Sequence, residues 1–209
     1  MEHSTLSKKA EKYIIDNILK GGYKPGDRIV EMKIADDLNM SQAPIREAIC
    51  NLKSTGFIEN EPYKGSKIKK FDSEDIRQIY SVRLIMEEYA IKEAINNIKE
   101  EELARLKSIV KEMYKAVAEE DYLQQLELDR DFHSYIIKIT KNKVLIKVWY
   151  SIGIGYWIYN AYEAIHKEAV NWEIEAEKHE KIYETLKNKD GESCIELIKD
   201  HYCNYLLKK

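Results

Sequence analysis

Four residues in the second half of the chain have side chains that commonly bind metal ions. Asp129 and His133 are four residues apart, so they share one face if this stretch is helical. His179 and His201 follow, each among apolar residues such as Ile182 and Ile198. An Asp/His pair alone is more often a hydrogen-bonded pair than a metal site. Three imidazoles and one carboxylate converging inside a helical bundle would form a site for Zn, Ni or Mn.

The elements that would position these side chains are helices. From Ser73 onward the sequence has essentially no strand signals, and its apolar periodicity predicts an all-helical bundle over residues 73–209. Short loops with turn residues, such as Lys189-Asp190-Gly191, separate the helices. We expect six of them, at 73–97, 100–119, 121–140, 142–168, 170–188 and 191–207.

Residues 1–70 have a different pattern, which predicts a separate domain. A helix over 7–20 ends at Gly21-Gly22, and a short extended run follows at 28–30. The next helix, 31–38, is expected to direct four apolar side chains inward. These are Met32, Ile34, Ala35 and Leu38.

A third helix begins after Ser41, which is expected to cap it, and carries the apolar stripe Ile45, Ala48, Ile49 and Leu52. Two short helices joined by the tight Asn39-Met40 turn are typical of a helix-turn-helix, whose second helix enters the major groove of DNA. After Gly56, two extended runs around a turn at 62–65 predict a β-hairpin, or wing. The fold class is therefore mainly α, with an N-terminal winged helix-turn-helix and a C-terminal helical bundle.

The charge of the chain is divided between these two parts. Residues 1–70 have 13 Lys/Arg and 10 Asp/Glu, whereas the remainder has 21 and 27. A weakly basic head on an acidic body fits contact with DNA phosphates at one end only.

The run from Gly21 to Ile68 resembles the GntR family of winged helix-turn-helix regulators, most specifically in the segment SQAPIREAI, 41–49. The resemblance implies operator binding, with Pro44 in the first helical turn and Arg46 directed to the groove. Two positions depart from the family: Gln42 and Asn51 stand where Arg is usual, which favours contacts to adenine over guanine. The candidate DNA-contacting residues are Ser41, Gln42, Ala43, Pro44, Arg46, Asn51, Lys53, Lys64, Gly65 and Lys67.

The C-terminal part resembles the FCD domain that follows this head in the FadR subgroup, in its six-helix VanR-like branch. The resemblance rests on the runs RLIME at 83–87 and DxxFH at 129–133, on Asn142 and on the two later histidines. In metal-binding members an Asp and three His hold a divalent ion, which here implies Asp129, His133, His179 and His201.

A six-coordinate ion with four protein ligands keeps two open positions, which a carboxylate-bearing metabolite could occupy. Arg83 is a candidate second contact for such an effector, because guanidinium binds carboxylate through two hydrogen bonds. An ion pair with Glu87, four residues further along the helix, is the alternative for Arg83.

These patterns lead to one functional hypothesis. We expect a homodimeric transcription regulator that binds a pseudo-palindromic operator and responds to a small organic acid. Of the two possible modes of action, we expect repression. Three alternatives stay open: the ion itself is the signal, the ion has a purely structural role, or the chain is a metalloenzyme. No distinctive general base or nucleophile motif supports an enzyme.

The first residues include no basic segment leading into an apolar one, so we expect a cytoplasmic protein without a membrane partner. The three cysteines form no C-x-x-C pair, and packing as small residues is the expected role.

Overall fold

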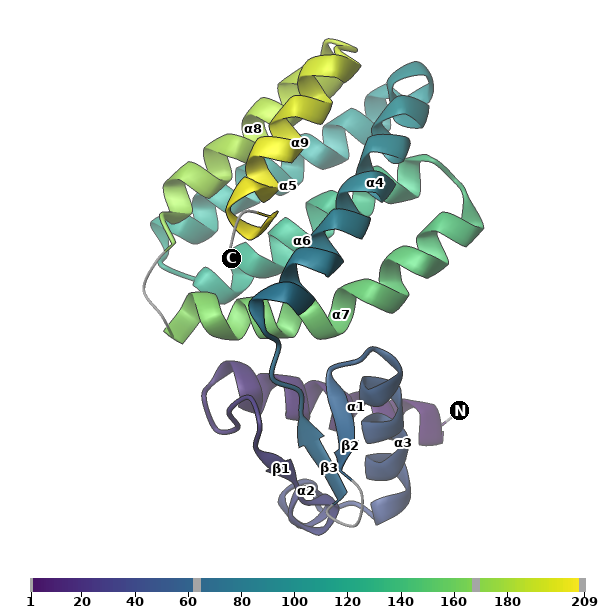
Figure 1. Ribbon diagram of the computed structural model, residues 1–209, viewed down its shortest axis with the longest axis vertical. Coiled ribbons are helices and arrows are strands. Elements are labelled where there is room, and N and C mark those ends of the chain that lie inside the picture. The colour runs from purple at the N-terminus through teal and green to yellow at the C-terminus, as the bar shows by residue number, and fades with distance from the viewer. Residues whose placement is uncertain (1, 62–64, 167–169, 207–209) are drawn as a thin grey trace. The chain divides into compact units, whose positions relative to one another are not determined.

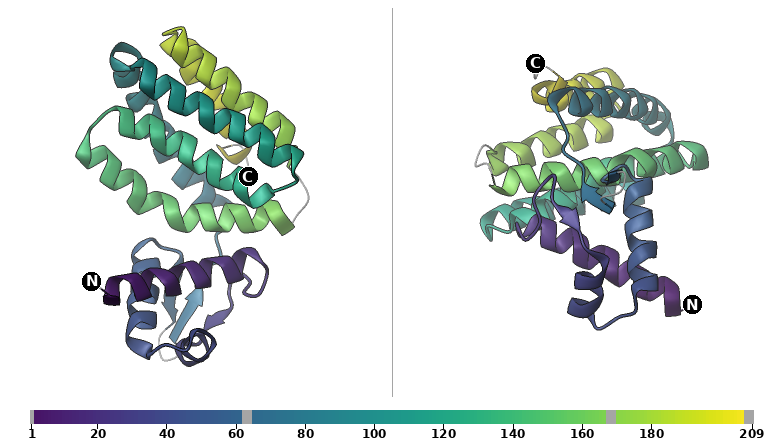
Figure 2. Two further views of the ribbon diagram at one scale, coloured as in Figure 1. Left: turned by 180° about the vertical axis from the view of Figure 1, so that it is seen from behind. Right: turned by 60° about the horizontal axis from the view of Figure 1, so that its bottom comes forward.

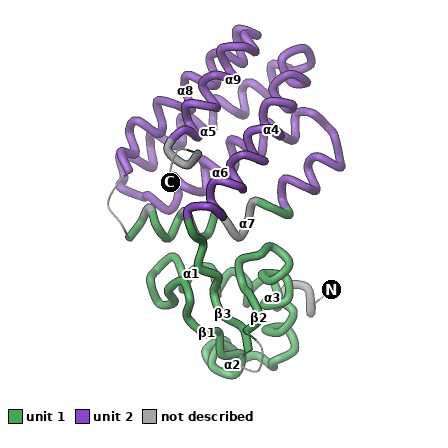
Figure 3. Tube along the Cα trace, in the orientation of Figure 1, with its two compact units in different colours: residues 1–72, 151–167 green, residues 73–150, 168–209 purple. Residues whose placement is uncertain are grey.

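A computed structural model describes residues 2–61, 65–166 and 170–206. The chain forms two compact units, one of residues 1–72 with 151–167 and one of residues 73–150 with 168–209 (Figure 3). Each unit has its own buried core, so each is described by itself.

Within residues 1–72, the described part of the chain forms three helices, which Figure 1 labels α1 (Glu2–Leu19), α2 (Glu31–Leu38) and α3 (Gln42–Ser54). Helix α2 ends where Asn39 adopts a left-handed conformation, with φ of 50° and ψ of 49°, and this turn leads directly to α3. Asn tolerates this conformation better than most residues. The predicted helix-turn-helix is thus confirmed, with α1 beginning five residues earlier than expected.

Helices α1 and α3 pack against each other and supply most of the core of this unit. The apolar stripes repeat at three- and four-residue spacing, as on one face of a helix. Among the described residues of 1–72, the apolar side chains that are at most 1% exposed are Ala10, Ile14, Ile18, Ile34, Ile45, Ala48, Ile49, Leu52, Phe57 and Ile68.

One of the side chains expected to face this core does not. Met32 is 62% exposed, whereas Ile34 and Ala35 on the same helix are buried. Residues two positions apart lie on nearly opposite sides of a helix, so Met32 and Ile34 cannot share a face.

The wing is a three-stranded antiparallel sheet of β1 (Arg28–Ile29), β2 (Ile58–Glu61) and β3 (Gly65–Ile68), in the order β1-β3-β2. Ile58 pairs with Ile68, and both side chains are buried. Glu59 pairs with Lys67 on the opposite face, where their side chains form an ion pair of 3.1 Å. This alternation follows the two-residue period of a strand.

From Ser73 onward the described residues form α-helices, and the six predicted helices are confirmed with bounds that move by a few residues. The helix over 143–166 is divided between the two units, and the other five belong to the second unit. Helices α4 and α9 lie side by side, as do α5 and α8 (Figure 2). Contacts link α4, α9, α8, α5 and α6 into a closed ring. The helices are α4 (Ser73–Asn97), α5 (Glu100–Ala118), α6 (Tyr122–Ile139), α7 (Lys143–His166), α8 (Trp172–Lys187) and α9 (Gly191–Leu206).

Polar side chains fix several of the helix starts. Asp121 accepts a hydrogen bond from the backbone N–H of Gln124, and Asn171 accepts one from Ile174. Asn142 accepts from the N–H groups of Val144 and Leu145 at the start of α7. Such caps satisfy donors that have no partner within the helix. Ser41 is the N-cap of α3 as expected, but its side chain makes no capping hydrogen bond.

The three cysteines are free thiols. Cys194 is buried, and burial raises the pKa of its thiol to about 11, which agrees with a packing role. Cys50 is exposed on α3, so packing does not explain it. Among the described residues, no helix combines the length and apolar composition that crossing a membrane requires.

Candidate metal centre and DNA-binding surface

The structure brings the four predicted ligands together inside the ring of helices. Asp129 and His133 come from α6, His179 from α8 and His201 from α9, and one ligand atom from each lies within 4.8 Å of the others. His133 Nε2 is 3.2 Å from His201 Nε2 and 3.3 Å from His179 Nε2. Asp129 Oδ1 is 3.1 Å from His179 Nε2. We call these four residues the quartet.

The local sequence explains why the quartet faces inward. Each histidine lies on the apolar stripe of its helix, and all three imidazoles are at most 6% exposed. The ring of Phe132 meets His133 and His179 edge-on, with centroids 5.7 and 5.0 Å apart. The carboxylate of Asp129 is 30% exposed, so the quartet has one edge toward solvent.

In each of the three histidines, Nδ1 faces an oxygen atom of a glutamate that is outside the quartet. His133 Nδ1 donates to Glu87 Oε2 on α4 at 2.6 Å, and His179 Nδ1 donates to the carbonyl of Glu175 at 2.7 Å. His201 Nδ1 lies 3.4 Å from Glu175 Oε2. Outer carboxylates and carbonyls commonly orient the histidines of metal sites in this way.

Sequence reasoning had not assigned these acidic residues to the site. Glu175 is four residues before His179, a spacing that places the two on one helix face and could have identified it. Glu87 was considered only as an ion-pair partner of Arg83, because nothing in the sequence places it beside His133.

The charges in the quartet are set by burial and by the neighbouring groups. Burial alone would raise the pKa of Asp129, but the hydrogen bonds from His179 and His201 hold it well below its usual range. Burial lowers the pKa of His201 to about 4, aided by the two other imidazoles and opposed by Asp129. Burial also acts against the charged form of His179, yet its hydrogen bond to Asp129 outweighs this and raises its pKa.

The residues of the quartet fit a divalent metal ion. Two nitrogen ligands of one ion, each at about 2.1 Å, are at most about 4.2 Å apart. The Nε2–Nε2 distances of 3.2 and 3.3 Å satisfy this limit.

Arg83 is next to this site and is buried, with 7% exposure. Its guanidinium carbon lies 4.6 Å from the ring centroid of Trp149 and 5.3 Å from that of Tyr202. Its Nη2 is 3.8 Å from Glu87 Oε1, so the ion pair expected as the alternative is present. Arg83 and His133 therefore contact the same carboxylate.

The candidate DNA-contacting residues of α3 lie mostly on its exposed face. Ser41, Ala43, Arg46 and Asn51 are exposed, whereas Pro44 is buried and contributes to the core. Arg46 donates from Nε to Glu31 at 2.8 Å and from Nη2 to the Gln42 side chain at 2.9 Å. These two bonds hold the guanidinium over the surface of α3.

The remaining candidates lie in or near the wing. Lys53 is half-buried at the end of α3, and Lys67 on β3 is the partner of Glu59. Gly65 begins β3 with a φ of 90°, which a residue with a side chain rarely adopts. Lys64 lies outside the described residues.

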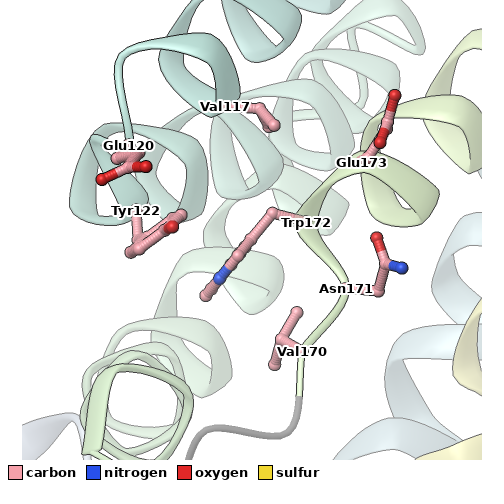
Figure 4. A pocket seen from close by; sticks show the side chains of 7 residues that line it. All are labelled: Val117, Glu120, Tyr122, Val170, Asn171, Trp172 and Glu173. Carbon is pink, nitrogen blue, oxygen red and sulfur yellow. The ribbon is translucent and has the colours of Figure 1, made fainter.

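The second unit also has a surface pocket, which shares no residue with the quartet. It is lined at the ends of α5 and α8 by side chains that include the stacked rings of Tyr122 and Trp172, with centroids 5.2 Å apart (Figure 4). None of the residues that line it belongs to the quartet.

A winged helix-turn-helix, followed by a helical unit with a buried cluster of potential metal ligands, defines a class of DNA-binding regulators with a sensor domain. Comparison with known families agrees: the pattern of the bacterial regulatory proteins of the gntR family matches residues 6–68, and that of the FCD domain matches residues 78–204. The chain belongs to the GntR family of regulators with an FCD domain, as the sequence motifs predicted.

Known relatives extend over most of the chain. The uncharacterized HTH-type transcriptional regulator YdhC of Bacillus subtilis is 28% identical over 90% of this chain and 85% of its own length. McbR of Escherichia coli is 26% identical, over 93% and 88%. The solved structure of E. coli McbR superimposes with a TM-score of 0.78 at 22% identity and covers 96% of both chains. The protein is therefore a transcription regulator rather than an enzyme, and the predicted function is confirmed at this level.

Proposed function

We propose that this protein controls transcription in response to a carboxylate metabolite bound at a divalent metal ion. In this proposal residues 1–70 bind operator DNA, and residues 73–209 hold the ion and the metabolite. The observation that carries it is the convergence of three Nε2 atoms and one carboxylate oxygen within 4.8 Å. Asp129, His133, His179 and His201 would bind Zn, Ni or Mn, for which imidazole and carboxylate are suitable ligands.

The ion would supply a positive charge and open coordination positions for an anion. A divalent ion bound by one carboxylate retains surplus positive charge, which favours an acidic ligand over water. Arg83, whose guanidinium is 3.8 Å from a carboxylate that also contacts His133, would contact the anion from one side. Metal and arginine together would recognise a small organic acid.

The DNA-binding half of the proposal rests on the exposed face of α3 and on the wing. Arg46, Gln42 and Asn51 would contact the major groove, and Lys67 would contact phosphates. A homodimer would place two copies of α3 on a pseudo-palindromic operator, since a two-fold protein matches a two-fold site. We propose a repressor of this kind acting in the cytoplasm.

The proposal is tested by operator binding with the ion and the acid varied separately. An operator is first selected from random DNA with zinc-loaded protein. Its affinity is then measured by fluorescence anisotropy with and without a chelator, and with a series of di- and tricarboxylic acids. We expect one acid to change the affinity by about 5- to 150-fold, the range of typical coupling between two sites.

The controls for this experiment are two arginine variants. Arg83→Gln should lose the response to the acid and retain the ion, whereas Arg105→Gln, an exposed arginine of α5, should respond like the wild type. An affinity that follows metal concentration with no acid present would make the ion itself the signal. An affinity that no acid and no chelator alters would refute the sensor part of the proposal.

Zinc binding should weaken as the pH falls through the pKa of His179. The hydrogen bond to Asp129 raises this pKa above its ordinary value, so the ion competes with a proton for His179 over a wider range of pH than at an ordinary histidine. We expect the zinc dissociation constant to fall steadily from about pH 6 to about pH 8, by up to tenfold for each unit of pH. Competition with a chromophoric chelator measures it, and a constant value across this range would contradict the assignment of His179 as a ligand.

A further inference from the structure

We propose that Glu87 is a positioning residue of the metal centre, which holds His133 with its proton on Nδ1 and its Nε2 lone pair directed at the ion. Glu87 contacts none of the other members of the quartet through a hydrogen bond in the described structure. Its role would be exerted entirely through His133. The inference rests on the proposed metal site and adds a residue from a fourth helix, α4, to it.

The carboxylate of Glu87 is buried and has a partner on each of its two oxygens. The side chain is fully buried, with an exposure of 0%. Oε2 accepts the hydrogen bond from His133 Nδ1 at 2.6 Å, while Oε1 accepts one from the hydroxyl of Tyr202 and faces Arg83 Nη2 at 3.8 Å. Both oxygens are thus engaged by groups from three different helices.

The direction of the hydrogen bond determines which nitrogen of His133 is available. A carboxylate that already accepts from Tyr202 and faces a guanidinium is an acceptor only, so Nδ1 of His133 must be the donor. In a neutral imidazole with Nδ1 protonated, Nε2 has the free lone pair that a metal ion requires. A carboxylate partner also makes the imidazole a stronger ligand.

The Nδ1 atoms of the other two histidines have weaker partners than the buried carboxylate that His133 contacts. His179 Nδ1 donates to a neutral backbone carbonyl, and His201 Nδ1 lies 3.4 Å from the carboxylate of Glu175, whose side chain is 28% exposed. Only in the Glu87–His133 pair are both side chains fully buried and within 2.6 Å. The Glu87–His133 hydrogen bond is therefore the most buried of the contacts that orient the three histidines.

The test compares Glu87→Gln with Glu88→Gln. Glu88 is the next residue on α4; its carboxylate lies 3.8 Å from Lys199 Nζ, and it is not part of the quartet. Zinc dissociation constants are measured by chelator competition, and cobalt-loaded proteins are compared by their visible absorption bands. We expect Glu87→Gln to bind zinc about 10- to 100-fold more weakly and to shift the cobalt bands. Glu88→Gln should match the wild type in both measurements.

The outcomes separate this inference from the proposed metal site. If the wild type binds no zinc, the metal site fails and the inference falls with it. If the wild type binds zinc and Glu87→Gln has the same dissociation constant and the same cobalt spectrum, the metal site stands and the role of Glu87 is overturned.

A second measurement applies if Glu87→Gln does not fold. In zinc-loaded wild-type protein, nitrogen-15 NMR of the imidazoles should show a His133 Nδ1–H proton that exchanges slowly with solvent, because it is donated to a buried carboxylate. An Nδ1–H proton that exchanges as fast as that of an exposed histidine would overturn the inference.

Discussion

Replacing both His133 and His179 with alanine is expected to lower the metal content of the purified protein from about one ion per chain to none. The two substitutions remove two of the three Nε2 atoms that converge in the quartet, and the remaining two ligands cannot hold an ion against dialysis. Elemental analysis after dialysis measures the change. The acid-dependent change in operator affinity should disappear with the ion.

The matched control is His166→Ala, because His166 is on α7 and is not part of the quartet. Its metal content should equal that of the wild type, and circular dichroism should show the same helical content for all three proteins. An equal and negligible metal content in the wild type and the double variant would mean that the quartet is only a hydrogen-bonded cluster. The DNA-binding part of the proposal would then survive alone.

Arg46→Ala should weaken operator binding by about 10- to 100-fold, since a well-placed arginine contact with DNA contributes about 1–3 kcal/mol. Arg46 lies on the exposed face of α3, and its bonds to Glu31 and Gln42 hold it in place before DNA arrives. Fluorescence anisotropy at fixed salt concentration measures the affinity, with Arg105→Ala as the control from the second unit.

The salt dependence of the same variant distinguishes the two kinds of contact. If Arg46 contacts a phosphate, the slope of affinity against salt should fall by about one unit and all operator sequences should be affected alike. If it contacts a base, the slope changes little and discrimination at one position of the operator is lost. Unchanged affinity in Arg46→Ala would exclude Arg46 from the interface.

Most of the fold could be predicted because the helices have strong local signals. Helix α4 begins and ends at the predicted residues, Ser73 and Asn97, and α2 at Glu31 and Leu38. Their apolar spacing and the turn residues around them are properties of a few neighbouring residues. Met32 was misplaced because its apolar character was weighed above its spacing, which is two positions from the buried Ile34 and therefore on the other side of the helix.

The site could be predicted only in part, for a physical reason. Asp129 and His133 share a helix face, so their proximity is local. His179 and His201 were selected for their apolar neighbours, and the family resemblance joined them to the pair. The contact of Glu87 with His133 joins residues 46 positions apart, and it depends on how α4 packs on α6. The sequence has 37 acidic residues, and no local pattern distinguishes the one that is buried beside an imidazole.

The sequence separation of the quartet has a consequence for the stability of the second unit. Nε2 of His133 meets those of His179 and His201, which are 46 and 68 residues further along the chain. An ion bound to all three would act as a removable cross-link that closes two long loops of the chain, and closing long loops reduces the entropy of the unfolded state. The supply of metal would then also determine how stable the folded bundle is in the cell.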